Sequence, residues 1–477
     1  MLSNVISNQL ETLRSLGVRQ FKTNSADVIP GDAFVCRQGI TLDGHDYAMK
    51  AIEKGACAII ANKPMQLNVP IIITESYYQS LALIKAYFNH PHKDITHIGV
   101  TGTNGKTTVS HCLNQALNID NRSAYIGTLG AKLIDVDLPL NNTTPDGVTL
   151  LNIFNDMRCN GIDFNVMELS SHALIQDRAG FVSLKVGVIT NIGQDHLDFH
   201  RTKDGYVQAK LQLIDRIQCN GTLVLNLDDP HSLAAMERAS GRVNVFSFSL
   251  KNPMADLVAS EIRTTEFGMR FNLSFAKKSV EVNSNMPFLY NVENALAVAG
   301  TLLTLGWDLK GVSTALSKIV MPEGRAQFVS LEDGRKGLID YAHNSDGIKA
   351  LLSSVQSIVK NRLIVVVGVT GDRIQQAANI GEICAEYADS IIFTSDNPMG
   401  VVQSDIFRAL SSKVGHKPHF EINDRVEAIK LAKQLSGEGD LILLCGKGGE
   451  TFQYINNGKW QKQNYIGDLA ALQENTL

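Results

Sequence analysis

One short stretch of this sequence predicts phosphate-binding chemistry. It runs Gly102, Thr103, Asn104, Gly105, Lys106, Thr107 and Thr108. An apolar, β-rich run over 95–101 precedes it, and a segment of helical character over 109–117 follows. In this context backbone N–H groups and the helix N-terminus face phosphates, the lysine neutralises their charge, and a threonine hydroxyl can hold Mg²⁺. The first glycine departs from the general spacing of such loops, but the context still predicts a nucleotide-using enzyme.

Polar side chains also follow two further predicted strands. Glu168 lies near the end of a strand over 165–169, and a strand over 186–191 is followed by Asp195 and His196. Ligand sites in parallel sheets lie at the carboxyl ends of the strands. We therefore expect Glu168 and His196 to hold Mg²⁺ or water, with Glu168 the stronger candidate because Mg²⁺ prefers oxygen ligands. Lys210 falls on a predicted helix, where a lysine is normally a solvated residue.

The elements that must position these residues predict an α/β protein of three domains. Residues 1–92 form a small N-terminal α/β domain with strands over 56–61 and 69–74. Residues 93–322 form the central domain, a mononucleotide-binding parallel sheet with a further strand over 222–226, antiparallel hairpins within 240–285 and a helix over 291–305. Residues 323–477 form a second, Rossmann-like sheet with strands over 363–368, 390–394 and 441–445. Long, apolar strands separated by helical segments are typical of doubly wound sheets.

Composition excludes several classes of partner. The net charge is −4 and no long basic run occurs, so nucleic-acid binding is not expected. No apolar run reaches membrane-spanning length, so a membrane partner is not expected either. The seven cysteines are dispersed without a C-x-x-C pair, as in proteins of the reducing cytoplasm. We therefore expect a cytoplasmic protein.

Taken together, the motifs resemble the Mur ligase superfamily and, within it, most closely the MurE family. The resemblance extends in order from about residue 30 to 453. Its motifs include the phosphate loop, Asn142–Asp146, Glu168–Leu174, Asp195–His200, Tyr206–Lys210, Asn291–Leu296, Gly324-Arg325, Asp340–His343, Gly371–Arg373, Asp396–Pro398 and Gly446–Gly448 with Glu450. The resemblance implies an ATP- and Mg²⁺-dependent ligase that adds an amino acid to UDP-N-acetylmuramoyl-L-Ala-D-Glu, a step of peptidoglycan precursor synthesis and so of cell-wall biogenesis. The family default is a monomer.

The resemblance also implies roles for individual residues. Lys106 would bind ATP phosphates, Thr107 and Glu168 would hold Mg²⁺, and His196 would lie near a second metal ion. Lys210 would be carbamylated to N6-carboxylysine. The residues implied as catalytic are Lys106, Lys210, His196 and Glu168, and those implied at the metal are Thr107, Glu168 and His196. The nucleotide would be contacted by the phosphate loop, Asn294, Arg325 and Asp340. The muramoyl substrate would be contacted by Ser25, Thr143, Thr144, Ser171, Gln176 and Arg178. The incoming amino acid would be surrounded by Arg373, Asp396, Asn397, Met399, Gly446 and Glu450.

Four departures from the family pattern fall in regions that recognise substrates. Ala26 and Met399 stand where arginines are expected, Gly449 replaces a histidine, and 374–378 replaces a basic stretch. A guanidinium at 399 would bind the distal carboxylate of diaminopimelate bidentately, so its loss leaves the acceptor amino acid open.

Three hypotheses follow. The first is a MurE-type ligase. The second is a MurE-like paralogue that joins an amino acid to another carboxylate outside peptidoglycan synthesis. The third is a nucleotide-dependent binding or regulatory protein without ligase turnover. Lys106, Glu168, His196 and Lys210 are all present, which speaks against the third. Sibling folylpolyglutamate or cyanophycin synthetases suit the 142–146 and 170–174 motifs less well.

Overall fold

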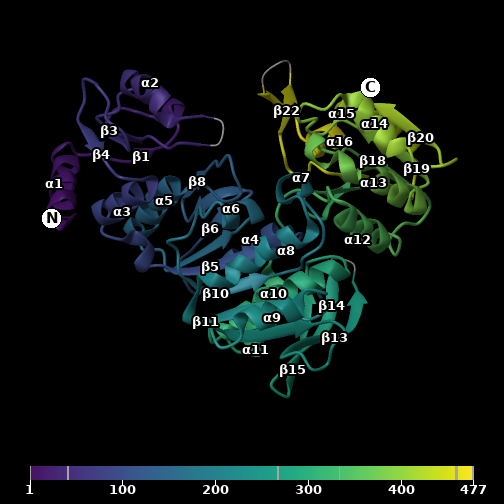
Figure 1. The fold of residues 1–477 in the computed structure, drawn as a ribbon. Helices are drawn as coiled ribbons and strands as arrows, with labels where there is room; N and C mark the ends of the chain where they lie inside the picture. Colours follow the sequence, from purple (N-terminus) through teal and green to yellow (C-terminus); the bar gives the residue numbers. More distant parts are fainter. Residues whose placement is uncertain (1, 40–41, 266–267, 332–333, 457–459, 475–477) are drawn as a thin grey trace. The chain divides into compact units, whose positions relative to one another are not determined.

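The chain forms two compact units, each built from more than one segment. Figure 1 shows the helices and strands of the chain. The structure is a computed structural model, and it describes residues 2–39, 42–265, 268–331, 334–456 and 460–474. The first unit comprises Met1–Val100, Leu117–Gly187 and Asp215–Gly221. The second comprises Thr101–Ala116, Val188–Ile214 and Thr222–Leu477.

The first unit begins with a four-stranded parallel sheet of order β1-β2-β3-β4. Its elements are α1 (Leu2–Ser15), β1 (Phe21–Lys22), β2 (Ala33–Val35), α2 (Ala48–Glu53), β3 (Ala58–Ala61), β4 (Ile71–Ile73) and α3 (Tyr77–Tyr87). Alternate residues of β3 enter different cores. Ala58 and Ile60 pack with residues of α1 and α3, whereas Ile59 and Ala61 pack with residues of α2. Both faces are covered, which is why the strand is apolar throughout.

The rest of the first unit is a sheet with helices α5 (Gly147–Cys159) and α6 (Ser171–Ile175). Its strands are β5 (Thr96–Thr101), β6 (Ser123–Gly127), β7 (Gly130–Leu133), β8 (Val136–Leu138) and β9 (Phe164–Glu168). β9 pairs in parallel with β5 and with β6, and β6, β7 and β8 pair antiparallel in succession. The pairing with β5 and β6 brings Glu168 to the carboxyl end of a parallel sheet, as predicted.

The central part of the second unit corrects one expectation. Two strands enter it from the first unit, β10 (Leu184–Ile189) and β11 (Ile217–Asn226). Antiparallel hairpins were predicted within 240–285, and β13 (Leu257–Thr264), β14 (Met269–Phe275) and β15 (Lys278–Ser284) confirm them. The prediction was wrong for β12 (Asn244–Ser249), which pairs in parallel with β11. The cause is helix α9 (Ser232–Ala239), which carries the chain back across between the two strands.

Six helices accompany the central strands of the second unit. The phosphate loop leads into α4, and the remaining five follow the strands in the chain. They are α4 (Lys106–Leu117), α7 (Leu197–His200), α8 (Lys203–Leu211), α9, α10 (Leu289–Thr304) and α11 (Leu309–Lys318). Helix α10 is buried along most of its length, which fits its run of apolar residues.

The C-terminal part of the second unit is a six-stranded sheet of order β16-β17-β21-β18-β19-β20. Its strands are β16 (Gln327–Ser330), β17 (Lys336–Asp340), β18 (Leu363–Val367), β19 (Ser390–Thr394), β20 (His419–Ile422) and β21 (Leu441–Cys445). Its helices are α12 (Ser345–Val355), α13 (Ile374–Tyr387), α14 (Gln403–Ser411), α15 (Arg425–Leu435) and α16 (Asp468–Gln473), and a hairpin of β22 (Phe452–Asn456) and β23 (Trp460–Asn464) precedes α16. Among the described residues of this sheet, only β16 pairs antiparallel with its neighbour.

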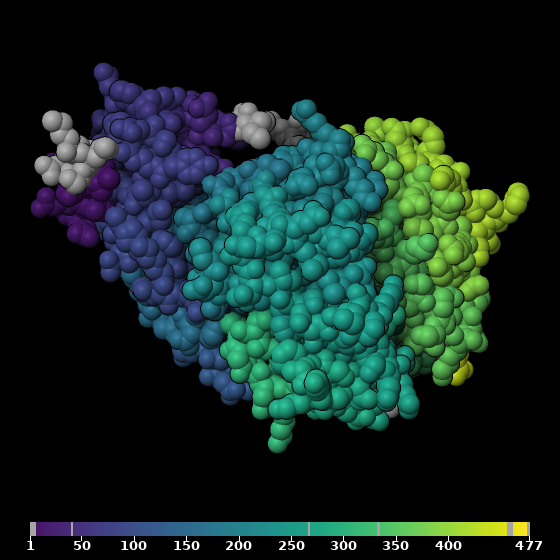
Figure 2. All heavy atoms as spheres, turned by 60° about the horizontal axis from the view of Figure 1, so that its bottom comes forward, coloured from purple at the N-terminus to yellow at the C-terminus, as the bar shows by residue number. Residues whose placement is uncertain are grey.

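Apolar strands place this sheet between two helical layers, as the predicted Rossmann-like architecture requires. Leu363, Val365 and Val367 of β18 pack with α12, α13 and α14, whereas Ile364 and Val366 pack with α15 and α16. Within the second unit, the surface of the central residues, drawn in teal, adjoins that of the C-terminal residues, drawn in green (Figure 2). Of the helices that the structure describes, none is long and apolar enough to cross a membrane.

Candidate active site

The residues that follow β10 hydrogen-bond to the phosphate loop and fix its shape. Asn191 brackets Asn104: its Oδ1 accepts from the Asn104 backbone N–H at 3.0 Å and its Nδ2 donates to the Asn104 carbonyl oxygen at 3.1 Å. Thr103 Oγ1 accepts from the Gly193 N–H at 2.9 Å. Gly105 has φ +85°, a left-handed conformation that favours glycine. The loop is therefore built into a fixed shape by neighbouring backbone and amide groups.

Two lysine amines meet at one carbonyl oxygen of this loop. Lys106 Nζ donates to the Gly102 carbonyl oxygen at 3.0 Å, and Lys210 Nζ donates to the same oxygen at 2.6 Å. Lys210 is buried, unlike most lysines on helices, because α8 turns this residue inward onto the loop. Burial, and next the charge of Lys106, lower the pKa of Lys210 well below its ordinary value. This favours a neutral amine at Lys210.

Two of the three residues expected at the nucleotide, Asn294 and Arg325, contact the same loop. A Cβ placed on Gly105 would lie 2.4 Å from Asn294 Oδ1, so the α10 side chain rests against the loop. Arg325 Nη2 donates to Thr107 Oγ1 at 3.3 Å, and its guanidinium stacks over the Tyr341 ring at 4.1 Å. Asp340, at the end of β17, accepts from the N–H groups of Ala326 and Ala342, both at 2.7 Å.

The ends of β19 and β21 form a second polar cluster around Lys447. This buried ammonium donates to Asn397 Oδ1 at 2.9 Å and Glu450 Oε2 at 3.3 Å, and lies 3.1 Å from Asp396 Oδ1. Burial raises the pKa of Glu450, with Lys447 opposing the shift. Three of the residues expected around the amino acid are thus brought together by a lysine that the sequence analysis did not single out. Its one sequence signal is its place between two glycines directly after an apolar strand.

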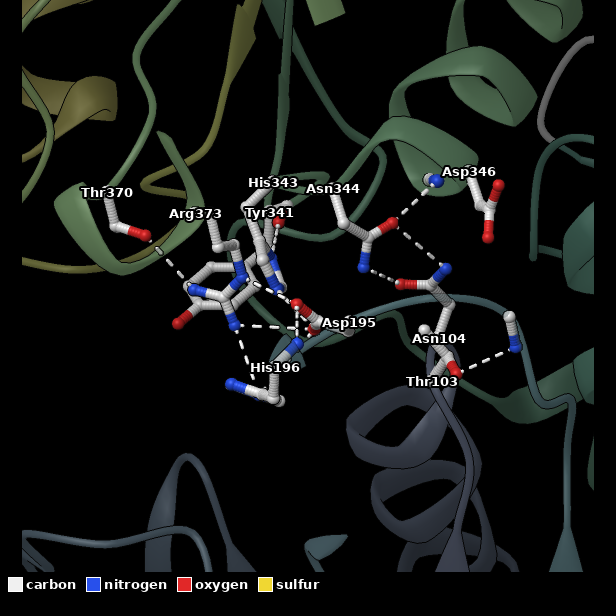
Figure 3. A network of polar contacts seen from close by, with 12 residues as sticks. Thr103, Asn104, Asp195, His196, Tyr341, His343, Asn344, Asp346, Thr370 and Arg373 are labelled. Atoms are coloured by element: carbon white, nitrogen blue, oxygen red, sulfur yellow. Dashed lines mark hydrogen bonds and ion pairs between the residues drawn. The ribbon is translucent and has the colours of Figure 1, made fainter. Parts of the chain in front are cut away.

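Asp195 joins the loop after β10 to the C-terminal residues of the unit (Figure 3). Arg373 donates to both carboxylate oxygens of Asp195, at 2.8 and 3.3 Å, and its Nη2 lies 3.2 Å from His196 Nε2. Burial alone would raise the pKa of Asp195, but Arg373 and then His196 and His343 outweigh it and hold that pKa well below its ordinary value. The pair therefore stays ionised.

A second polar link joins the phosphate loop itself to α12 (Figure 3). Asn344 Nδ2 donates to Asn104 Oδ1 at 3.0 Å, and Asn104 Nδ2 donates to Asn344 Oδ1 at 3.3 Å. Asn344 is also the N-cap of α12, where its Oδ1 accepts from the Gly347 N–H at 2.8 Å. The same buried amide thus caps a helix and holds the loop.

The candidate substrate residues of the first unit gather beside Glu168. Thr144 Oγ1 donates to the Glu168 carbonyl oxygen at 2.7 Å, and Arg178 Nη1 donates to the Thr144 carbonyl oxygen at 2.8 Å. Arg178 Nε also donates to Gln176 Oε1 at 2.9 Å. Ser171 is buried in the first turn of α6. Ser25 lies apart from these residues in the sequence, in a 3₁₀ turn at 25–27 capped by Asn24.

A phosphate loop that leads into α4, with the charged strand ends of the C-terminal sheet in the same unit, is typical of a nucleotide-dependent enzyme with α/β domains. Three family models match successive parts of the chain. They are the Mur ligase family catalytic domain over 18–129, the Mur ligase middle domain over 100–302, and the Mur ligase glutamate ligase domain over 324–448.

Relatives that match most of the chain are also Mur ligases. The UDP-N-acetylmuramoyl-L-alanyl-D-glutamate--2,6-diaminopimelate ligase of Geobacillus thermodenitrificans is 36% identical over 91% of this chain and 90% of its own length. A solved structure of a ligase with that name aligns with a TM-score of 0.63 at 27% identity, over 95% of this chain and 94% of the other. The MurF ligase of Thermotoga maritima in complex with ADP shares the fold, with a TM-score of 0.72 at 21% identity over 90% and 94%.

The chain belongs to the Mur ligase family. It is an enzyme of the ligase class, which confirms the first hypothesis at the level of family and does not favour a paralogue with another carboxylate substrate.

Proposed function

We propose that this protein is an ATP-dependent ligase that joins an amino acid to UDP-N-acetylmuramoyl-L-Ala-D-Glu. The observation that supports the nucleotide chemistry best is the assembly of Lys106, Arg325 and Asn294 around one phosphate loop. The carboxylate substrate is proposed from the names of relatives that match this chain over nine-tenths of its length. We also propose that residues 1–92, 93–322 and 323–477 are the substrate, ATP and amino-acid domains of a monomer.

The reaction has two steps in this proposal. The substrate carboxylate attacks the γ-phosphorus of ATP, which releases ADP and leaves an acyl phosphate. The amine of the amino acid then attacks the acyl carbon, and the tetrahedral intermediate collapses to an amide and inorganic phosphate. Lys106 and the N–H groups of the phosphate loop stabilise the charge that develops on the transferring phosphoryl group.

The side-chain chemistry of two of the three proposed metal-binding residues suits Mg²⁺ well. Glu168 and Thr107 offer a carboxylate and a hydroxyl oxygen, the hard donors that Mg²⁺ prefers alongside phosphate and water. His196 fits less well, because Arg373 can only donate, so His196 Nε2 accepts at that contact and its lone pair is already used. Among the described residues no group of three His, Cys, Asp or Glu side chains could hold a metal alone. The ion would supply charge neutralisation at the phosphates.

Lys210 is the proposed site of carbamylation. A neutral amine is the form that attacks carbon dioxide, forming an N–C bond and releasing a proton. The lowered pKa of Lys210 supplies that form, and the product is an anion beside Lys106. The carbamate would offer another oxygen close to the phosphate loop.

The amino acid is proposed to bind at the ends of β19 and β21, beside Asp396, Asn397, Gly446 and Glu450, with Arg373 nearby. Met399 takes part in the same loop and has φ +49°. Its thioether offers no charge to a second carboxylate, so the structure does not repeat the arginine contact that the family pattern provides for diaminopimelate. The experiment therefore has to determine which amino acid the enzyme adds.

The test is phosphate release by the purified protein with Mg·ATP and UDP-N-acetylmuramoyl-L-Ala-D-Glu, against a panel of amino acids that includes meso-diaminopimelate and L-lysine. We expect turnover with one amino acid and its loss in Lys106→Ala. ATP binding without turnover with any of them would refute the proposed substrate.

A further inference from the structure

Tyr125 lies in the interior of the first unit and makes a contact that no sequence pattern assigned. It belongs to β6, and its side chain is 0% exposed. β6 runs parallel to β9 in the register Tyr125↔Val166 and Ile126↔Met167, so Glu168 follows directly after the paired residues. The phenol O–H donates to Glu168 Oε1. A phenol needs a hydrogen-bond partner when it is buried, and here the partner is the candidate metal ligand.

Glu168 is held by further donors from the turn after β6. The Thr128 backbone N–H donates to Glu168 Oε1 at 3.0 Å, and Thr128 Oγ1 donates to Oε2 at 3.3 Å. The phenol oxygen in turn accepts from the Leu129 N–H at 3.2 Å. Tyr125 therefore joins the carboxylate to the backbone of the turn and anchors its Oε1.

Gly127 makes this contact possible. A Cβ at this position would lie 2.2 Å from Glu168 Oε1 and 2.2 Å from the Tyr125 hydroxyl, closer than any real Cβ contact. The glycine is needed for space, and not for backbone conformation. The Tyr125 phenol and the Glu168 carboxylate thus occupy the space that a side chain at position 127 would fill.

We infer that Tyr125 is a positioning residue for Glu168 and sets the affinity of that carboxylate for a divalent cation. Groups that hydrogen-bond to a metal ligand fix its orientation, and their loss commonly reduces metal affinity 10- to 100-fold. A phenol O–H bonded to a carboxylate is a charge-assisted contact, among the stronger hydrogen bonds of proteins. This inference rests on the proposed metal role of Glu168.

The test is Mn²⁺ binding in the presence of ADP, followed by electron paramagnetic resonance of free Mn²⁺, for the full-length protein. Tyr125→Phe removes one oxygen and keeps the ring. We expect its Mn²⁺ affinity to fall about 10-fold, and its Mg²⁺ requirement for ATP turnover to rise while the rate at saturating Mg²⁺ stays near that of the parent protein. Tyr87→Phe is the matched control, because its hydroxyl donates to the Val18 carbonyl oxygen at 2.7 Å in the same unit; it should leave Mn²⁺ affinity unchanged.

Two further variants separate the possible failures. Glu168→Gln should reduce Mn²⁺ affinity more than Tyr125→Phe does. Gly127→Ala should reduce it by pushing the phenol and carboxylate apart, and it stands in for Tyr125→Phe if that variant does not fold. If Glu168→Gln weakens Mn²⁺ binding and neither of the other two does, Tyr125 is only structural and the inference is overturned. If Glu168→Gln also binds Mn²⁺ normally, the metal role of Glu168 is wrong, whatever the outcome of the ligase assay.

Discussion

The ion pair between Asp195 and Arg373 should show a large energetic coupling. Its side chains are 4% and 12% exposed, and two N–H···O contacts of 2.8 and 3.3 Å join them. Removing one partner leaves the other charge buried and unpaired, which typically costs about 3–5 kcal/mol. Asn at 195 keeps one acceptor oxygen, so Asp195→Asn should fall near the lower limit, about 3 kcal/mol. Arg373→Met should cost a similar amount.

The double variant should be much less destabilised than the sum of the two single variants, because neither buried charge remains. We expect a coupling energy of about 3 kcal/mol from the double-mutant cycle. The assay is urea unfolding followed by tryptophan fluorescence. Both tryptophans, Trp307 and Trp460, belong to the second unit, as does the ion pair, so the signal reports the relevant unit.

The matched control is the pair Arg408–Asp405, which also lies in the second unit but on its surface, with side chains 77% and 48% exposed. Exposed pairs of this kind contribute little, so its cycle should show no significant coupling. If the cycle for Asp195 and Arg373 gives a coupling no larger than that of the control, the argument from burial is refuted.

Three further predictions concern separate features. Lys210→Ala should lose at least 100-fold in ligase turnover, on the scale of removing a group that organises charge at the phosphates. The parent protein equilibrated with ¹³C-bicarbonate should give a carbamate NMR signal that this variant lacks. A parent protein without that signal would exclude carbamylation. Gly105→Ala should reduce ADP affinity at least 10-fold, because residue 105 has a left-handed conformation and the added Cβ would lie 2.4 Å from Asn294 Oδ1. Gly415 is also left-handed, but no atom lies within 4 Å of the position of its Cβ. Gly415→Ala should therefore leave ADP affinity, measured by calorimetry, unchanged. His97 is fully buried, and burial lowers its pKa to about 4. Between that value and the ordinary pKa of 6.5, the imidazole is protonated in the unfolded chain but neutral in the folded protein. The free energy of unfolding should therefore fall as pH decreases through this window, by about 2 kcal/mol at pH 5. His97→Gln should remove that part of the pH dependence in urea unfolding followed by circular dichroism, and an equal pH dependence in both proteins would contradict the assignment.

Local patterns in the sequence predicted about half of the described strands. The predicted strands over 390–394 and 441–445 have the same bounds as β19 and β21, because each is an apolar run that the sheet buries on both faces. β20 was not predicted, since three of its four residues are exposed and the strand lies at the sheet edge, where apolar patterning is not required. The orientation of β12 was wrong for a different reason: it depends on the crossover helix and not on the strand.

Local patterns alone predicted only those parts of the candidate site that lie within one motif, and the residues farther along the chain were named through the family resemblance. The phosphate loop carries its own signal in glycine, lysine and threonine spacing. The contact of Asp195 with Arg373 joins residues 178 positions apart, and that of Asn104 with Asn344 joins residues 240 apart. No local pattern encodes such pairs. Local sequence does not indicate the burial of Lys210 for the same reason, because the oxygen that it contacts lies 108 positions earlier in the chain.

The place of β21 has a consequence for the synthesis of this protein. β21 is the last strand of its sheet in the chain, yet it pairs with β17 on one side and β18 on the other. Until Cys445 has left the ribosome, those two strands have unpaired edges that face each other across a missing neighbour. The first unit has all of its segments once Gly221 is made, so it can fold early, while the second unit waits for almost the whole remaining chain. A nascent chain stalled before β21 would expose two apolar strand edges, which are templates for aggregation.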